Sequence, residues 1–72
     1  MQRSTKAFGI YYWDTFDPPG QDTDLIDEAD TLEAAEALVE QGYAGRLGPG
    51  GADYIEIVRE RDGEIMRRFN VG

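Results

Sequence analysis

The sequence predicts a single α+β domain with the element order β-α-β-β, in which an antiparallel sheet of three strands carries one helix on one face. Three observations support this fold: an aromatic and β-branched segment at 7–13, a helical apolar period at 31–41, and two alternating segments on either side of Asp62-Gly63. The pair Leu25-Ile26 either forms a fourth strand beside the first or anchors a loop. With 72 residues and no cysteine, the chain lies near the lower size limit for a domain that folds alone.

The segment 7–13 is predicted to be the first strand because its aromatic and β-branched residues alternate with a period of two. Its two sides carry Phe8, Ile10 and Tyr12 on one and Ala7, Gly9, Tyr11 and Trp13 on the other. Asp17-Pro18-Pro19-Gly20 then ends the strand, because proline has no backbone donor and glycine favours a turn. Residues 1–6 are expected to form a flexible tail.

A helix is predicted over 31–41, with either Asp30 or Thr31 as its N-cap. The apolar residues that recur at helical spacing and should face the sheet are Leu32, Ala35, Leu38 and Val39. Gly42 is expected to end the helix in the left-handed conformation. The glycines of 42–51 then predict a mobile connector, and the phosphate-binding pattern of a P-loop is absent from it.

The last two segments, 53–60 and 64–71, are predicted to form a hairpin. A two-residue turn would set Ile55 and Ile57 opposite polar residues. A three-residue loop over 61–63 instead pairs Glu60 with Glu64 and gives one apolar face. We expect the longer loop, because register follows the hydrophobic pattern. It pairs Ile55 with Phe69, Glu56 with Arg68, Ile57 with Arg67, Val58 with Met66 and Arg59 with Ile65.

This register predicts both faces of the sheet. The expected core comprises Phe8, Ile10, Tyr12, Leu32, Ala35, Leu38, Val39, Ile55, Ile57, Ile65 and Phe69, with Val71 on the same face. One helix covers one face only, so the opposite face, with Tyr11, Trp13, Tyr54 and Met66, should stay partly open. Such a face is a candidate interface, or an ordinary set of half-exposed strand residues.

Charge is distributed unevenly along the chain. The acidic block, residues 14–40, holds ten carboxylates and no basic residue, so it contributes −10 to a net charge of −8 and the rest contributes +2. We expect 14–30 to be an acidic loop and the helix to carry Glu33, Glu36 and Glu40 as a ladder on one outward face. The ladder is either a solvated surface or a series of charges spaced along an axis, as phosphates are in DNA.

Several function classes are disfavoured. There is no histidine, and no carboxylate pair has an obvious pocket to raise a pKa, so we expect no enzymatic activity and no cofactor. The acidic residues between Asp22 and Glu33 approach EF-hand spacing, but Asp27 stands where the turn needs glycine, so we expect no metal site. Acidity disfavours direct contact with nucleic acid or anionic membranes. No signal peptide or membrane span is expected, which favours a cytoplasmic location.

Two functional hypotheses remain. The first is an inhibitor that binds a basic nucleic-acid-binding protein, with carboxylates in place of phosphates and aromatic anchors beside them. Its candidate residues are Asp14, Asp17, Asp22, Asp24, Asp27, Glu28, Asp30, Glu33, Glu36 and Glu40, with Tyr11, Trp13 and Phe16 as anchors. The second is a small interaction or oligomerisation module that uses the open sheet face, its acidity serving solubility or reflecting a halophilic source. Under either hypothesis we expect the chain to be a monomer or a weak homodimer.

The size, the acidic block and the element order together resemble small acidic phage-encoded inhibitors of bacterial defence, including anti-CRISPR proteins that mimic DNA. No residue motif carries this resemblance. It implies binding to the DNA-reading cleft of a CRISPR effector, in competition with target DNA or PAM recognition, in the cytoplasm of a bacterial host. Arg59, Arg61, Arg67 and Arg68 depart from a uniformly acidic mimic and imply that only one side of the molecule imitates DNA.

Overall fold

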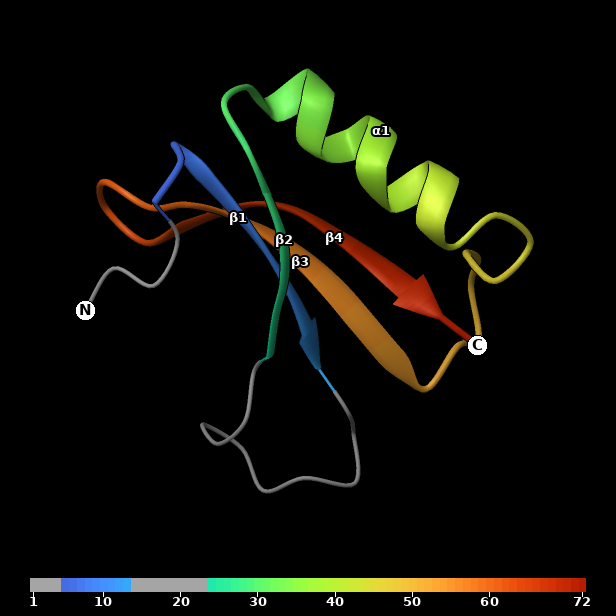
Figure 1. Ribbon diagram of the computed structural model, residues 1–72. Helices are drawn as coiled ribbons and strands as arrows, with labels where there is room; N and C mark the ends of the chain where they lie inside the picture. Colours follow the sequence, from blue (N-terminus) through green and yellow to red (C-terminus); the bar gives the residue numbers. More distant parts are fainter. Residues whose placement is uncertain (1–4, 14–23) are drawn as a thin grey trace.

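Residues 5–13 and 24–72 are described by the computed structural model of this chain. They form an α+β fold, a four-stranded antiparallel sheet with one helix across one face (Figure 1). The elements are β1 (Phe8–Trp13), β2 (Asp24–Ala29), α1 (Leu32–Gly42), β3 (Asp53–Arg59) and β4 (Glu64–Val71). In this part of the chain no helix has the length and apolar character needed to cross a membrane.

The sheet order is β2-β1-β3-β4, so β1 and β3 are central and β2 and β4 are the edges. The pair Leu25-Ile26 therefore lies in a strand. This strand, β2, pairs with β1 from Phe8 opposite Ala29 to Tyr12 opposite Asp24. The acidic loop predicted over 14–30 is wrong for 24–29, because β1 supplies the backbone partners that make this acidic segment a strand. Residues 14–23 lie outside the described part of the chain.

Each edge strand contains a bulge. In β2, Ile10 pairs with Asp27 and Tyr11 with Leu25, so Ile26 is the extra residue. In β4, Ile57 pairs with Arg67 and Val58 with Ile65, so Met66 is the extra residue. Bulges are common on edge strands, where they disrupt the regular edge that another chain could extend.

Helix α1 begins after Thr31, whose Oγ1 accepts a hydrogen bond from the Ala34 amide at 3.1 Å. Thr31 is thus the N-cap, and Asp30 is not. The prediction that Gly42 ends the helix in the left-handed conformation is wrong. The Tyr43 amide still donates to the Val39 carbonyl at 3.0 Å, which keeps Gly42 within the helix. After the helix, the first glycine with a positive φ is Gly45.

The predicted connector over 42–51 is tied to the end of β4. Leu47 forms a bridge with Val71, and the Gly48 amide donates to the Asn70 carbonyl at 3.2 Å. Gly51 packs closely against Val71, since a Cβ at that position would lie 2.6 Å from the Val71 carbonyl oxygen. The glycines therefore allow the chain to pass directly beside the last strand.

The hairpin confirms part of the predicted register. Ile55–Phe69, Glu56–Arg68 and Ile57–Arg67 pair as expected, whereas the pairs nearer the turn are wrong. The loop contains the four residues 60–63, because Gly63 adopts φ 75° and donates to the Arg59 carbonyl at 2.8 Å. The bulge at Met66 absorbs the change. As a consequence Val58 pairs with Ile65, which is 48 % exposed and not in the core.

The core lies between the sheet and α1, which contacts β1, β2 and β3. Its fully buried members are Ile10, Ala29, Ala35, Val39, Ile55, Ile57 and Val71, with Phe8, Tyr12, Leu32, Leu38, Tyr43, Leu47 and Phe69 packed against them. The predicted core is confirmed apart from Ile65. Ala29, Tyr43 and Leu47 were not predicted, because they come from the edge strand and the connector.

Candidate partner-binding surface

The acidic block spans two adjoining elements, the edge strand β2 and helix α1. Of the predicted site residues, Asp14, Phe16, Asp17 and Asp22 lie outside the described residues, and Asp24 is described only as the first residue of β2. The six remaining carboxylates are Asp27 and Glu28 in β2, Asp30 in the following turn, and Glu33, Glu36 and Glu40 in α1. The fold therefore brings these six onto one strand–helix unit.

The three helix glutamates differ in their surroundings. Glu33 and Glu40 are exposed, whereas Glu36 is half-buried on the flank of the helix that faces β4. Its Oε2 lies 3.8 Å from Nε of Arg67 in β4. Arg67 is exposed and Glu36 is still partly accessible to solvent, so this pair adds little stability. The ladder is thus present, but one member is turned toward the sheet edge.

The carboxylates around β2 contact mainly backbone and hydroxyl groups. Asp27 Oδ1 accepts from the Glu28 amide at 2.8 Å. The two carboxylate oxygens of Glu28 accept from the Thr5 amide at 3.1 Å and the Thr5 hydroxyl at 3.0 Å. Within the described residues, Asp27, Asp30, Glu33 and Glu40 form no ion pair with a basic side chain. Four of the block's carboxylates are therefore available to an external cation.

The five carboxylates outside the block are all engaged. Asp53 accepts from the Tyr12 hydroxyl at 2.7 Å, and Glu60 accepts from the Tyr11 hydroxyl. Glu56, only 4 % exposed, accepts from the Trp13 indole and from the guanidinium of Arg68, whose NH2 lies at 2.6 Å. Asp62 and Glu64 both bind Arg59 at the hairpin, as described next. These carboxylates serve the fold.

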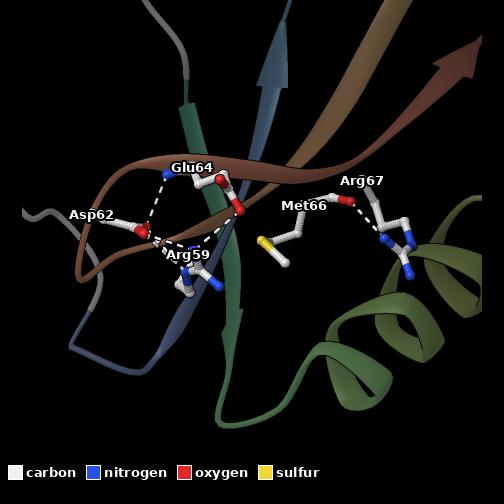
Figure 2. A network of polar contacts seen from close by, with 5 residues as sticks. All are labelled: Arg59, Asp62, Glu64, Met66 and Arg67. Atoms are coloured by element: carbon white, nitrogen blue, oxygen red, sulfur yellow. Dashed lines mark hydrogen bonds and ion pairs between the residues drawn. The ribbon is translucent and has the colours of Figure 1, made fainter.

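At the hairpin turn, Asp62 and Glu64 converge on the guanidinium of Arg59 (Figure 2). The distances from NH2 of Arg59 are 2.7 Å to Asp62 and 3.1 Å to Glu64. Hydrogen bonds from Arg59 and from the Glu64 amide hold the pKa of the Asp62 carboxyl at about 2. The charges at the hairpin turn thus largely neutralise one another.

At the start of β3, the hydrogen bond from Tyr12 to Asp53 raises the pKa of Tyr12 above its ordinary value.

The predicted anchor Tyr11 is only 7 % exposed. Its ring lies over Gly9, where an added Cβ would be 2.7 Å from the Tyr11 ring edge. Its hydroxyl donates a hydrogen bond to Glu60, the residue that follows β3. Tyr11 therefore covers its own sheet, and a partner could reach little of it.

Trp13 remains partly accessible and is held in place. Its indole nitrogen donates to Glu56, and its ring centroid lies 6.5 Å from that of Tyr54. The guanidinium of Arg68 lies 5.2 Å from the centroid of Tyr54. The face opposite the helix is thus crossed by a polar network of the protein's own side chains. The bond from Trp13 to Glu56 was not predicted, although a carboxylate between two isoleucines of a central strand was a signal that it needed a partner.

Among the described residues, no group of three acidic, histidine or cysteine side chains is placed to hold a metal ion. The hollows that involve the acidic block lie beside α1. No family model, curated protein or solved structure matches this chain.

Proposed function

We propose that this protein is a non-enzymatic inhibitor that occupies a basic nucleic-acid-binding surface of another protein, with its acidic block in place of DNA phosphates. The observation that carries this proposal is the division between its carboxylates. Those outside the block all accept a hydrogen bond from a tyrosine, tryptophan or arginine side chain, whereas Asp27, Asp30, Glu33 and Glu40 accept none from any side chain of the described residues.

Electrostatic cost supports the proposal. Like charges three or four residues apart on a helix each cost about 0.2–0.5 kcal/mol. A surface with both signs interspersed avoids a large field of one sign, yet no basic residue occurs between Lys6 and Arg46. A field of one sign instead attracts a basic surface and speeds its encounter. The block is therefore better explained by a cationic partner than by solvation.

The helix also arranges its charges along an axis, as DNA does, at wider intervals. The helix glutamates are separated along the axis by about 4.5 and 6 Å, and duplex DNA carries one charge per roughly 1.7 Å of axis. A cleft that reads phosphates could accept carboxylates at such intervals. The DNA-reading cleft of a CRISPR effector is one target of this chemistry, and an inhibitor of it would act in the cytoplasm of a bacterial cell.

The alternative, an interaction module that uses the open sheet face, has less support. Tyr11 is buried over Gly9, and Trp13, Tyr54 and Arg68 are engaged with one another or with Glu56. The large apolar side chains that remain exposed among the described residues are Ile26 and Ile65, which lie on opposite edge strands. They do not form one apolar patch.

The test is a pull-down from bacterial lysate with two variants of equal charge change. Glu33→Gln with Glu40→Gln removes two carboxylates of the block, and Asp62→Asn with Glu64→Gln removes two of the hairpin. We expect wild type and the hairpin variant to retain the same nucleic-acid-binding protein, released by salt or by duplex DNA, and the block variant to lose it. Equal retention by all three proteins, or no release by DNA, would contradict the proposal.

A further inference from the structure

The two flanks of helix α1 differ in chemistry. Glu36 lies on the flank toward β4, where it contacts Arg67, and the exposed Glu33 and Glu40, three residues before it and four after it, lie on the same side of the helix. The flank toward β2 carries Ala34, Ala37, Leu38 and Gln41, which line one side of a hollow. Only the first flank presents carboxylates, so a partner that reads the block meets an acidic ridge beside an uncharged surface.

The hollow is a groove of about 470 Å³ between this uncharged flank and the β2–α1 turn. Its inner surface is mainly apolar and comes from Ala29, Ala34, Ala37 and Leu38, of which Ala29 is buried in the core. The small alanine side chains leave the space open. An aliphatic chain laid along this flank would contact the alanine and leucine side chains.

The rim of the groove is polar and mostly acidic. Asp30 lies at the turn, is exposed, and makes no hydrogen bond or ion pair with another described residue. Gln41 and Glu28 also line the groove, and Lys6 is the one basic residue among the described ones that does. The positive end of the helix dipole, equivalent to about half a charge, lies nearby, and Asp30 and Glu33 together outweigh it. The groove therefore combines an apolar surface with the Asp30 carboxylate at the β2–α1 turn, which attracts a cation.

We infer that this groove takes one arginine side chain of the basic partner, with the aliphatic stem over Ala34, Ala37 and Leu38 and the guanidinium at Asp30. Arginine buries its stem along apolar surface while its head stays polar. Its planar fork also matches a carboxylate in a bidentate geometry, as it matches the phosphate that it would otherwise bind. This inference rests on the proposed function and identifies the partner's side chain that this protein would bind.

The test uses the whole protein and N-acetyl-arginine amide, with N-acetyl-citrulline amide as the neutral isostere. Backbone amide shifts are followed by NMR at low ionic strength. We expect saturable shifts at Asp30, Ala34, Ala37 and Leu38 with the arginine compound and none with citrulline. Shifts confined to Glu33 and Glu40, or equal shifts with both compounds, would overturn the inference.

Variants sharpen this test. Ala37→Leu fills the groove without changing charge and should weaken arginine binding about tenfold, because the stem loses its apolar contact. Ala44→Leu, an exposed alanine outside the groove, is the matched control and should leave affinity unchanged. Asp30→Asn should weaken binding and Lys6→Gln should strengthen it. Thermal unfolding of each variant checks that the fold is kept. Unchanged affinity in Ala37→Leu would contradict the inference.

The two proposals can fail separately. If Ala37→Leu retains the same DNA-releasable protein as wild type, the groove is not used while the acidic block still is. If no such protein is retained but the arginine compound still binds at Ala34 and Ala37, the groove is real and the DNA-mimic function is wrong.

Discussion

The carboxylates of the acidic block and those of the β3–β4 hairpin are the same chemical group in opposite circumstances. In the hairpin, Glu56 is buried between the Trp13 indole and the Arg68 guanidinium, and Asp62 is bound by Arg59. In the block, Glu33 and Glu40 extend from α1 without a basic partner among the described residues. The hairpin charges stabilise the fold, whereas the glutamates of α1 repel one another.

This difference separates structural charge from functional charge within one small chain. When a carboxylate has a hydrogen-bonded partner in the fold, that bond offsets the free energy lost on its desolvation. A series of carboxylates without partners repels itself and gives the fold nothing in return. Substitutions in the two regions should therefore change stability and binding in opposite ways, which the following predictions use.

The largest effect is expected from Glu56→Ala. It leaves the Trp13 indole and the Arg68 guanidinium without their acceptor and should lower the free energy of unfolding by about 2–3 kcal/mol. Chemical denaturation measures this, and the single tryptophan reports the change directly by fluorescence. The matched block variant Glu40→Ala should cost nothing. Equal destabilisation by both variants would contradict the distinction between the carboxylates that stabilise the fold and those of the acidic block.

A smaller effect of opposite sign is expected from Glu40→Lys. Glu40 lies in the last turn of α1, where no basic residue balances the negative end of the helix dipole. The change should raise the free energy of unfolding by about 0.5–1 kcal/mol while it weakens capture of the basic partner. Denaturation at low salt, paired with the pull-down, checks both effects. If the variant is more stable and binds as well as wild type, Glu40 is not part of the partner-binding surface.

The smallest effect concerns pH. The pKa of Asp62 is lowered from its ordinary 3.8 to about 2 in the folded state, first by its hydrogen bonds from Arg59. Its contribution to stability is therefore complete above about pH 4 and is lost as the pH falls toward 2. Asp62→Asn should lack this contribution, so the difference in stability between it and wild type should shrink over that interval. A difference independent of pH between 2 and 5 would show that Arg59 does not act through this charge.

The sequence was sufficient for most of the fold because periodicity was strong where burial is strong. The strands around Ile10, Ile55 and Ile57 and the helix stripe at Ala35 and Val39 follow directly from alternation and helical spacing. The errors lie where local contacts override the pattern. The bulge at Met66 turned Ile65 out of the core, and β1 drew the acidic segment 24–29 into an edge strand.

The candidate site was less predictable, because exposure depends on partners far apart in the chain. Tyr11 is predicted on the open face but is covered by its own contacts with Gly9 and Glu60. Glu36 is predicted on the outward ladder but leans toward Arg67. The groove beside Ala34 and Ala37 cannot be predicted from the helix alone, since the β2–α1 turn forms its other wall.

The most direct test of the central claim is a competition between this protein and duplex DNA for the purified target that the pull-down identifies. We predict mutually exclusive binding. The concentration of protein needed for half-saturation should rise in proportion to the DNA present, and the Glu33→Gln, Glu40→Gln variant should compete poorly. A ternary complex of target, DNA and this protein, with affinity unchanged by DNA, would contradict the claim that the acidic block stands in for phosphates.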